Sequence, residues 1–497
     1  MKKVLLLSPP YLKYYMRNAR CDFVSLSKTQ WYPIWLGYCG AFLEKHGYKV
    51  RLIDAPSYRL SYRECENMAI EYEPDLLVVY SSTQSEDKDI EFVEKLVDKM
   101  HCRAVFVGPY VSISPEMVLK KTKRIDLAIK GEFEYPVFEL LKGTDYNQIK
   151  NLYYKIDEDI RHNESRPLLD TKELDGIPFV TDFFKRHLNF KYYKTPSEYY
   201  PFIDLMTGRG CEWGRCTFCL WVHSFIPGPV YNCRSISNVI GEFKFVETKM
   251  PRIRSIMVQD DTLTSERARE LSEQLLENNI KIPWSCYARP DMELDVLNLM
   301  KKAGCRNLHV GYESANLEVL KNIRKGITKD RMTRFNEDVK KSGLRIHADF
   351  AIGLEGETRE GVFETIKWAK ELDPETAQFQ LIIPYPSTPL YDSLKEKRFL
   401  SGNIPDYPGL SKEEMKSLAK RAYREFYLSG RYLKKAIMNP YERIFTRIDT
   451  ILSALNSIFF SKEIFGLFNI RMWFIRAWVI FSYIMFYIVF FKDFKNY

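Results

Sequence analysis

Histidine is scarce in this chain, and the amino-terminal end lacks a long apolar run. Only 7 histidines occur among 497 residues, and no obvious His-based triad accompanies them. The first apolar run stops after four residues at Ser8, Pro9 and Pro10, so it does not have the form of a signal peptide. Ten cysteines over this length are too few for a disulfide scaffold. We therefore expect a reducing, cytoplasmic location, where clustered cysteines act as metal ligands or catalytic thiols.

Excess positive charge is also absent, except near the carboxyl-terminal end. Residues 412–497 carry 15 Lys/Arg against 7 Asp/Glu, whereas the formal net charge of the whole chain is +9. The preceding residues are therefore almost neutral. This argues against a nucleic-acid-binding protein, because such a protein needs a basic folded face. The basic end favours an acidic partner instead, and an anionic membrane surface is one candidate.

The first 150 residues alternate short apolar runs with amphipathic helical patterns. Buried strands separated by helices predict βαβ units, and hence a doubly wound parallel sheet over residues 1–150. Ligands of such sheets bind at the carboxyl ends of the strands. Small, turn-forming residues occupy these ends: Ser8-Pro9-Pro10, Asp54-Ala55-Pro56, Ser81-Ser82-Thr83, Gly108-Pro109-Tyr110 and Gly131-Glu132. The pattern favours a ligand lying across this rim over turns that only connect strands.

A second alternation of strands and helices follows a polar stretch. Residues 151–199 are polar, contain prolines and have weak periodicity, which predicts a linker. Over residues 200–400 we expect about six strands, each followed by a helix, and this pattern predicts a partial (β/α)6 barrel. Its functional residues should lie at the carboxyl ends of the strands.

The remaining residues, 401–497, are expected to form a helical region with an apolar tail. Residues 472–491 are overwhelmingly apolar, and a helix of this length would be about 30 Å long. The uninterrupted apolar run, 477–491, is shorter, so lodging at the membrane interface is favoured over spanning. We expect peripheral contact with the inner face of the cytoplasmic membrane. The alternative is a helix buried against the barrel.

Three thiols lie close together in the stretch "GRGCEWGRCTFCLW", with the spacing Cys-x4-Cys-x2-Cys: Cys211, Cys216 and Cys219. A zinc ion usually takes four ligands, so a structural zinc site would need Cys233 or His223 as well. A 4Fe–4S cluster can be held by three thiolates, which leaves one iron open to a small molecule. Because the loop follows the first strand of the predicted barrel, it belongs at the barrel mouth, where chemistry is expected. This placement favours the cluster.

The same stretch resembles the cluster-binding loop of the radical S-adenosylmethionine (SAM) superfamily. The usual spacing there is Cys-x3-Cys-x2-Cys, so this chain has one extra residue between Cys211 and Cys216, and variants with a lengthened first gap are known in the superfamily. Phe218 matches the aromatic residue usually found before the third cysteine. The resemblance implies that the three cysteines hold a 4Fe–4S cluster and that SAM is bound beside it.

Further motifs at successive strand ends resemble the SAM-binding motifs of this superfamily. They are "QDDT" after the second strand, "GYES" after the fourth and "FAIGLEGET" after the fifth. The resemblance implies contacts to the SAM amino group, ribose, carboxylate and adenine. The residues it singles out for cofactor binding are Asp260, Asp261, Glu313, Gly353 and Gly356. Arg289, at the end of the third strand, is a further candidate, either for the SAM carboxylate or for the substrate.

The order of the two predicted domains is similar to that of radical SAM proteins with a cobalamin-binding domain. This class includes methyltransferases and an anaerobic magnesium-protoporphyrin ester cyclase. "WYPIWLGYCGAFLEKHGYKVRLIDAP", "WSCYARPD" and "AYREFYL" look most like the hopanoid-biosynthesis-associated branch. The first domain lacks the Asp-x-His-x-x-Gly signature, because neither His46 nor His101 has the required neighbours. We therefore expect cobalamin to bind without a histidine ligand to cobalt.

The resemblance implies a radical SAM enzyme that cleaves SAM reductively and functionalises an unactivated carbon. Methyl transfer and rearrangement or cyclisation are both open outcomes, and a lipid or hopanoid-type substrate is expected. The implied partners are a small-molecule or lipid substrate and an electron donor such as flavodoxin or ferredoxin, without nucleic acid. Two alternatives remain. One is a cobalamin-independent enzyme acting on a small molecule or peptide natural product, and the other is a non-catalytic metal-cluster scaffold at the membrane.

Overall fold

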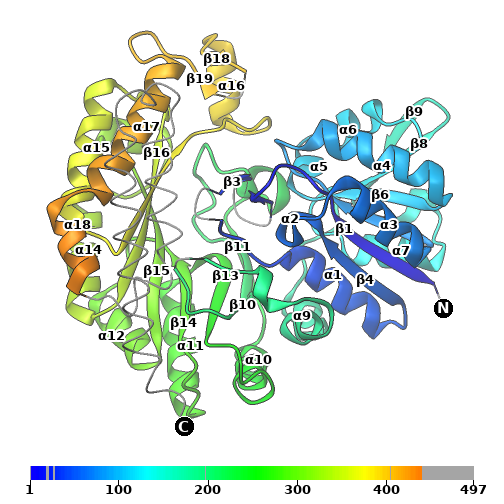
Figure 1. Ribbon diagram of the computed structural model, residues 1–497, viewed down its shortest axis with the longest axis horizontal. Helices are drawn as coiled ribbons and strands as arrows, with labels where there is room; N and C mark the ends of the chain where they lie inside the picture. Colours follow the sequence, from blue (N-terminus) through cyan, green and yellow to red (C-terminus); the bar gives the residue numbers. More distant parts are fainter. Residues whose placement is uncertain (1, 18–21, 26–27, 196, 403, 439–497) are drawn as a thin grey trace, which may run out of the picture.

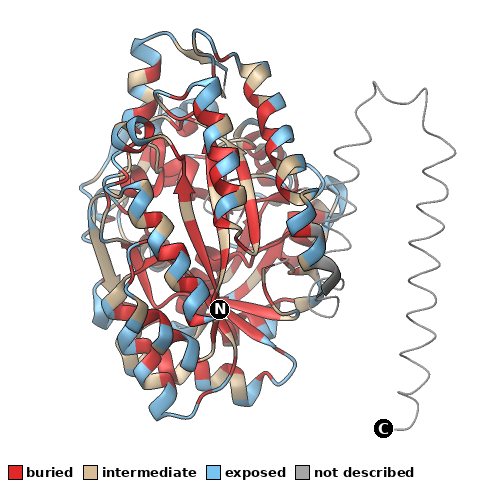
Figure 2. Cartoon of the chain, turned by 90° about the vertical axis from the view of Figure 1, so that its left-hand side faces the viewer, coloured by how far each residue is buried: buried red, intermediate tan, exposed pale blue. Residues whose placement is uncertain are grey.

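Two β-sheets, each with its connecting helices, lie side by side in the computed structural model (Figure 1). The structure describes residues 2–17, 22–25, 28–195, 197–402 and 404–438. Buried residues concentrate in the two sheets and on the helix faces turned toward them (Figure 2). The α/β architecture expected from the sequence is confirmed.

The first sheet has five parallel strands, followed by two antiparallel strands at one edge. Its order is β4 (Lys49–Asp54), β1 (Lys3–Ser8), β5 (Leu76–Tyr80), β6 (Arg103–Val107), β7 (Leu127–Ile129), β8 (Leu152–Ile156) and β9 (Asp159–His162). Leu5 and Leu7 enter one buried cluster, whereas Val4 and Leu6 enter the other. Alternate side chains of β1 therefore pack on opposite faces of the sheet, as a doubly wound sheet requires.

Helices connect these strands and cover both faces of the first sheet (Figure 1). They are α1 (Ile34–Lys45), α2 (Ala55–Tyr58), α3 (Tyr62–Tyr72), α4 (Glu86–Met100), α5 (Pro109–Ile113), α6 (Pro115–Lys121) and α7 (Glu134–Lys142). The capping box of α3 shows how local sequence sets a boundary. Ser61 accepts a hydrogen bond from the backbone N–H of Glu64, whose side chain bonds back to Ser61.

The stretch predicted as a linker, residues 151–199, is folded rather than extended. It supplies β8 and β9 to the first sheet and also forms α8 (Thr171–Asp175) and α9 (Val180–His187). Glycines on α1 let α9 approach closely, because a Cβ at Gly37 would lie 2.4 Å from the ring of Phe184. Polar composition did not reveal this packing, since the two short strands and α9 expose many polar side chains. The domain limits given above stay predictions.

All six strands of the second sheet are parallel and follow the order of the chain, as in a partial barrel. They are β10 (Phe202–Leu205), β13 (Ser255–Leu263), β14 (Trp284–Ala288), β15 (Cys305–Glu313), β16 (Arg345–Ile352) and β17 (Thr376–Leu381). The intervening helices are α10 (Ile236–Lys249), α11 (Ser265–Glu277), α12 (Leu294–Lys302), α13 (Leu317–Asn322), α14 (Lys329–Ser342), α15 (Arg359–Leu372) and α16 (Pro389–Glu396). The predicted (β/α)6 arrangement is confirmed.

Two basic helices follow the barrel and pack on its outer side (Figure 1). They are α17 (Lys412–Tyr427), which lies against β17, and α18 (Gly430–Met438). Every helix in the part of the chain that the structure describes is too short or too polar to cross a bilayer. The apolar stretch 472–491 lies outside the described residues, so its predicted membrane contact stays a prediction.

A buried ion cluster joins the chain after β7 of the first sheet to the hairpin that follows β10. Arg209 lies in β11 (Gly208–Cys211), a short strand after β10, and its Nη1 is 2.6 Å from Glu132 Oε1. Its Nη2 is 2.7 Å from Glu134 Oε1. Both carboxylates come from the chain just after β7, and all three side chains are at most 6% exposed. The guanidinium also lies 4.7 Å from the ring centroid of Trp35.

Removal of the arginine should therefore be costly. Arg209→Ala leaves two buried carboxylates without their counter-ion, so we expect the free energy of unfolding to fall by about 3–5 kcal/mol. Urea denaturation followed by circular dichroism measures the change. The matched control is Arg269→Ala, which removes an exposed guanidinium paired with Asp295 and should barely move the midpoint. Equal midpoints for the two variants would contradict the role assigned to the ion cluster.

Candidate functional site

The three clustered cysteines lie in a loop that begins in a tight hairpin. β11 pairs antiparallel with β12 (Val230–Cys233), so Cys211 lies opposite Val230. Gly210 has φ +95°, and a Cβ there would lie 2.2 Å from the carbonyl oxygen of Val230. Only glycine fits this close approach. The hairpin thus fixes where the first cysteine leaves the sheet.

Trp213 in the first gap and Thr217 in the second attach the cysteine loop to the end of α13. The indole N–H of Trp213 donates to the carbonyl oxygen of Arg324 at 2.9 Å, and a Cβ at Gly326 would collide with that ring. The backbone N–H of Thr217 donates to the carbonyl oxygen of Ile323 at 3.0 Å. Trp213 was not singled out from the sequence, although its position inside the unusual four-residue gap was a signal.

All three thiols are half-buried and close enough to influence one another. Burial and the neighbouring thiols raise the pKa of Cys219 to about 12, and burial also raises that of Cys216. His223 Nε2 lies 3.0 Å from the carbonyl oxygen of Cys216. Across the described residues, no three His, Cys, Asp or Glu side chains are grouped so that they could hold a single metal ion. The donor set fits a 4Fe–4S cluster, which takes one thiolate per iron, better than a single zinc ion.

The two acids of "QDDT" have different surroundings at the end of β13. Asp260 is buried and accepts hydrogen bonds from the backbone N–H of Thr207 at 2.6 Å and from the hydroxyl of Tyr231 at 2.5 Å. Burial raises its pKa. Asp261 is half-exposed and accepts from the backbone N–H of Gly210 at 2.8 Å. Asp260 therefore holds the entry to the cysteine loop, and Asp261 lies beside it.

A buried lysine, which sequence reasoning missed, pairs with the predicted glutamate. Lys325 Nζ lies 2.7 Å from Glu313 Oε1. Burial alone would lower the pKa of Lys325, but Glu313 and the nearby Cys216 outweigh it, so the pKa is raised. Glu313 has φ +64°, a strained backbone for a non-glycine residue. Arg289 donates to the carbonyl oxygen of Lys325 at 3.1 Å and lies 4.8 Å from the Trp213 ring centroid.

The two predicted glycines lie in the turn after β16, and both have positive φ. A Cβ at Gly353 would lie 2.8 Å from the sulfur of Met415 on α17, and one at Gly356 would lie 2.6 Å from the side-chain nitrogen of Asn322. Tyr407 donates to the carbonyl oxygen of Gly353 at 2.9 Å. The turn is therefore tightly packed and needs glycine at both positions.

The rim of the first sheet meets the chain that follows the third cysteine. A Cβ at Gly131 would lie 3.2 Å from the carbonyl oxygen of Phe225. Ile113 at the end of α5 forms a small apolar cluster with Leu220 and with Tyr385, which follows β17. The predicted ligand rim of one sheet and the cysteine loop of the other are therefore neighbours.

Polar groups without partners line this rim. Asp54 Oδ1 and Thr83 Oγ1 are buried and have no hydrogen-bond partner among the described residues. Such orphaned groups suit a large polar ligand. His46 and His101 instead follow the carboxyl ends of α1 and α4, which belong to the opposite end of a βαβ unit. A cobalamin at the rim would meet polar side chains and neither of these histidines.

Comparison with protein families gives two matches, one for each sheet. Residues 21–141 match the B12 binding domain, and residues 205–369 match the radical SAM superfamily. The chain is 30% identical over 435 residues to an uncharacterized methyltransferase of Pyrococcus horikoshii, covering 84% of this chain and 92% of the relative. It is 24% identical to the anaerobic magnesium-protoporphyrin IX monomethyl ester cyclase of Rubrivivax gelatinosus, covering 83% of this chain and 77% of the relative.

Two solved structures share the fold over most of the chain. The radical SAM methyltransferase TsrM from Kitasatospora setae, with cobalamin and a [4Fe–4S] cluster bound, matches with a TM-score of 0.63 and 18% identity, covering 82% of this chain and 80% of that chain. OxsB, a cobalamin-dependent SAM radical enzyme, matches with a TM-score of 0.57 and 17% identity, covering 80% of this chain and 56% of that chain. At these identities the likeness shows the fold.

The close approach of Gly210 to Val230 predicts how two glycine substitutions change the amount of bound iron. Gly210→Ala forces a Cβ into the Val230 carbonyl, so we expect Cys211 to shift and bound iron to fall severalfold after anaerobic reconstitution. Gly228 also has a positive φ, +88°, but a Cβ at this position would lie in open space. The Gly228→Ala variant should therefore keep most of its iron. Iron assay and absorption spectra measure both. Equal iron content in the two variants would show that the close approach is unimportant.

Proposed function

The chain belongs to the radical SAM family whose members carry a B12-binding domain, and we propose that it transfers a methyl group to an unactivated carbon. It is a radical SAM enzyme, and its cofactors are SAM, a 4Fe–4S cluster and cobalamin. When bound, the cluster supplies the electron that cleaves SAM, and cobalamin supplies a methyl group. The contact between the first-sheet rim and the cysteine loop carries the proposal, because it brings the two cofactor sites together.

Cys211, Cys216 and Cys219 are the proposed cluster ligands. Half-exposed Asp261 is proposed to accept hydrogen bonds from the SAM ammonium, and Glu313 to accept from its ribose. Asp260 is already bonded to Thr207 and Tyr231, so its proposed task is to hold the loop entry. Further members of the SAM site are proposed at Arg289, Gly353 and Gly356.

Two observations bear on the outcome of the reaction. Methyl transfer is favoured by the relatives named as methyltransferases, among them the cytidylyl-2-hydroxyethylphosphonate methyltransferase of Streptomyces wedmorensis, which is 26% identical. Cyclisation is the second candidate, because the magnesium-protoporphyrin ester cyclase is also similar. The hopanoid-type substrate and a flavodoxin or ferredoxin electron donor stay predictions.

The cysteine assignment predicts loss of both cluster and activity. Cys216→Ala should lower bound iron and 5′-deoxyadenosine formation by at least about a hundredfold, because a cluster held by two thiolates is not retained. Anaerobic reconstitution with SAM and a chemical reductant tests this by chromatography. Cys233→Ala, a change in β12 outside the ligand set, is the control and should keep both properties. Activity in Cys216→Ala would exclude this ligand set.

Cobalamin binding should depend on the rim and not on histidine. Thr83→Val removes a buried hydroxyl without a partner, so we expect the affinity for hydroxocobalamin to fall severalfold. His46→Ala and His101→Ala should leave the absorption spectrum and the affinity unchanged. Equilibrium dialysis with each variant measures both. Absence of saturable binding by the wild type, or its loss in a histidine variant, would overturn the rim assignment.

Membrane contact through residues 472–491 is proposed as well, from the apolar sequence and its flanking basic residues. Full-length protein should sediment with membranes at low salt, whereas protein truncated after residue 465 should remain in the supernatant. The comparison is made by fractionation and immunoblotting. Full-length protein found wholly in the supernatant without detergent would refute the contact.

A further inference from the structure

The inner face of the second sheet is polar on its last strands. Phe350 and Phe379 point to the outer helices, where their ring centroids lie 6.1 Å from those of Trp368 on α15 and Phe426 on α17, respectively. Side chains of a strand point alternately to its two faces, so the residues that neighbour Phe350 on β16 and Phe379 on β17 in this alternation face inward. These inward residues are His347, Asp349, Gln378 and Gln380. Barrels of this type usually carry branched aliphatic residues inside, so a polar wall calls for an explanation.

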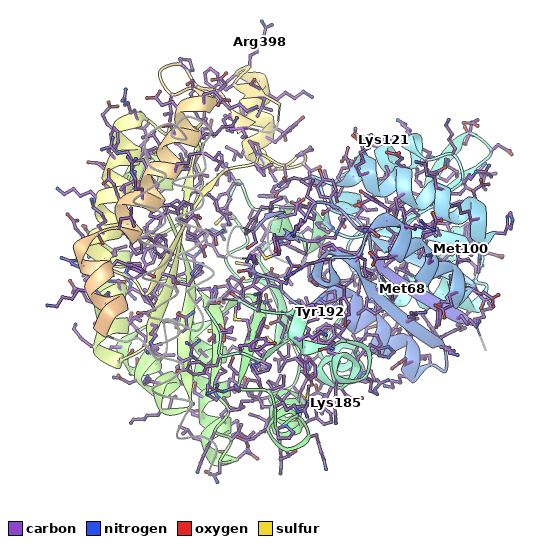
Figure 3. The ribbon with its side chains drawn as sticks, viewed as in Figure 1. Met68, Met100, Lys121, Lys185, Tyr192 and Arg398 are labelled. Atoms are coloured by element: carbon purple, nitrogen blue, oxygen red, sulfur yellow. The ribbon has the colours of Figure 1, made fainter. Side chains whose placement is uncertain are left out.

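Part of this wall is open to water. The side chain of Asp349 is 34% exposed and that of His347 is 18% exposed, whereas the outward residues beside them are buried. Gln378 and Gln380 are half-buried. Figure 3 shows that side chains of both domains occupy the region between the two sheets. The exposed part of Asp349 and His347 offers hydrogen-bonding groups on β16 to a molecule in solution.

The wall continues inward as a row of aromatic and imidazole rings. His309 on β15 lies between His347 and Tyr287, with ring centroids 4.8 Å and 5.0 Å away. His347 Nδ1 lies 2.7 Å from the hydroxyl of Thr376, and its Nε2 lies 3.5 Å from Asp349 Oδ1. The second distance is longer than a good hydrogen bond, so both groups retain capacity for a ligand.

The deep end of the row also contains unsatisfied polar atoms. His309 Nε2 and Glu198 Oε1 are buried, lie 3.8 Å apart and have no hydrogen-bond partner among the described residues. Burial raises the pKa of Glu198 to about 7 and lowers that of His309 well below its usual value. Trp31 from the first domain closes this end, with its ring 6.0 Å from that of His309.

The row leads toward the proposed SAM site. Glu313 lies four residues after His309 on β15, and the pairing with β16 shifts register between Gly311 and Glu313. The Glu313 carboxylate lies over Gly311, where a Cβ would be 2.3 Å from its Oε1. Glu313 pairs with Lys325 beside the cysteine loop. The polar wall and the proposed reaction centre therefore belong to one continuous inner face.

We infer that this inner face, with Asp349 and His347 at its centre, binds the methyl-accepting substrate through hydroxyl or amino groups of that substrate. The inference rests on the proposed methyl transfer and narrows the substrate class to polar, water-soluble molecules, in place of the hopanoid-type lipid expected from the sequence. A hydrocarbon surface would strip water from the carboxylate and imidazole without replacing its hydrogen bonds. An anionic group would be repelled by Asp349. Hydroxyl and amino groups donate to the carboxylate and also pair with imidazole and amide groups.

The test uses the full chain loaded anaerobically with cluster and cobalamin, together with SAM whose methyl group is deuterated. Two probes are supplied separately. They are the water-soluble and the chloroform-soluble extracts of cells of the organism that produces this protein. Mass spectrometry then searches for products that carry the labelled methyl group. We expect the labelled product in the water-soluble extract. A product found only in the chloroform extract would overturn the inference but leave the proposed methyl transfer intact.

Two substitutions test whether Asp349 and His347 bind the substrate. Asp349→Asn and His347→Ala should lower the labelled product by about tenfold or more, since each removes a hydrogen bond to a charged or buried group. Their iron content and cobalamin spectrum should match the wild type, which excludes misfolding. Asp330→Asn, an exposed change on α14, is the matched control. Unchanged product in both inner-face variants would overturn the site, whereas no labelled product with either extract would overturn the methyl transfer as well.

Discussion

The structure depends on one buried arginine that lies between two carboxylates of the other domain. Arg209 is two residues before Cys211, and Glu132 and Glu134 follow the last parallel strand of the first sheet. Charges are expensive to bury, so such a cluster persists only when every partner is in place. The position of the cysteine loop is thereby tied to the rim of the first sheet. A displacement of either element would leave charges unpaired.

This constraint suits chemistry that uses two cofactors in sequence. A reactive radical needs a site that is closed to water and a reacting partner at short range. The apolar contact of Ile113, Leu220 and Tyr385 joins the same two rims a short way from the ion cluster. Asp260, Trp213 and the Gly210 hairpin then fix the loop from the barrel side. Loop position is thus set by non-local contacts from both domains.

Local patterns in the sequence predicted the fold and indicated the candidate site. Apolar runs with alternating helices predicted both sheets, and the three cysteines marked the loop that is proposed to hold the cluster. The residues that hold this loop were not predictable, because their partners are distant in sequence. Lys325 carries no motif, yet it pairs with Glu313, and Asp260 is a loop anchor because Thr207 and Tyr231 reach it. The folded stretch 151–199 was hidden by its polar composition, since its packing depends on glycines of α1.

The central claim is that the cobalamin rim and the cysteine loop face each other in one protein. Electron paramagnetic resonance tests this claim most directly, because two unpaired electrons broaden each other's signals only at short range. The protein is loaded with cob(II)alamin, with the reduced cluster, or with both. If the two sites face each other, the doubly loaded sample shows signals broadened by mutual coupling. A spectrum equal to the sum of the two singly loaded samples would contradict this claim.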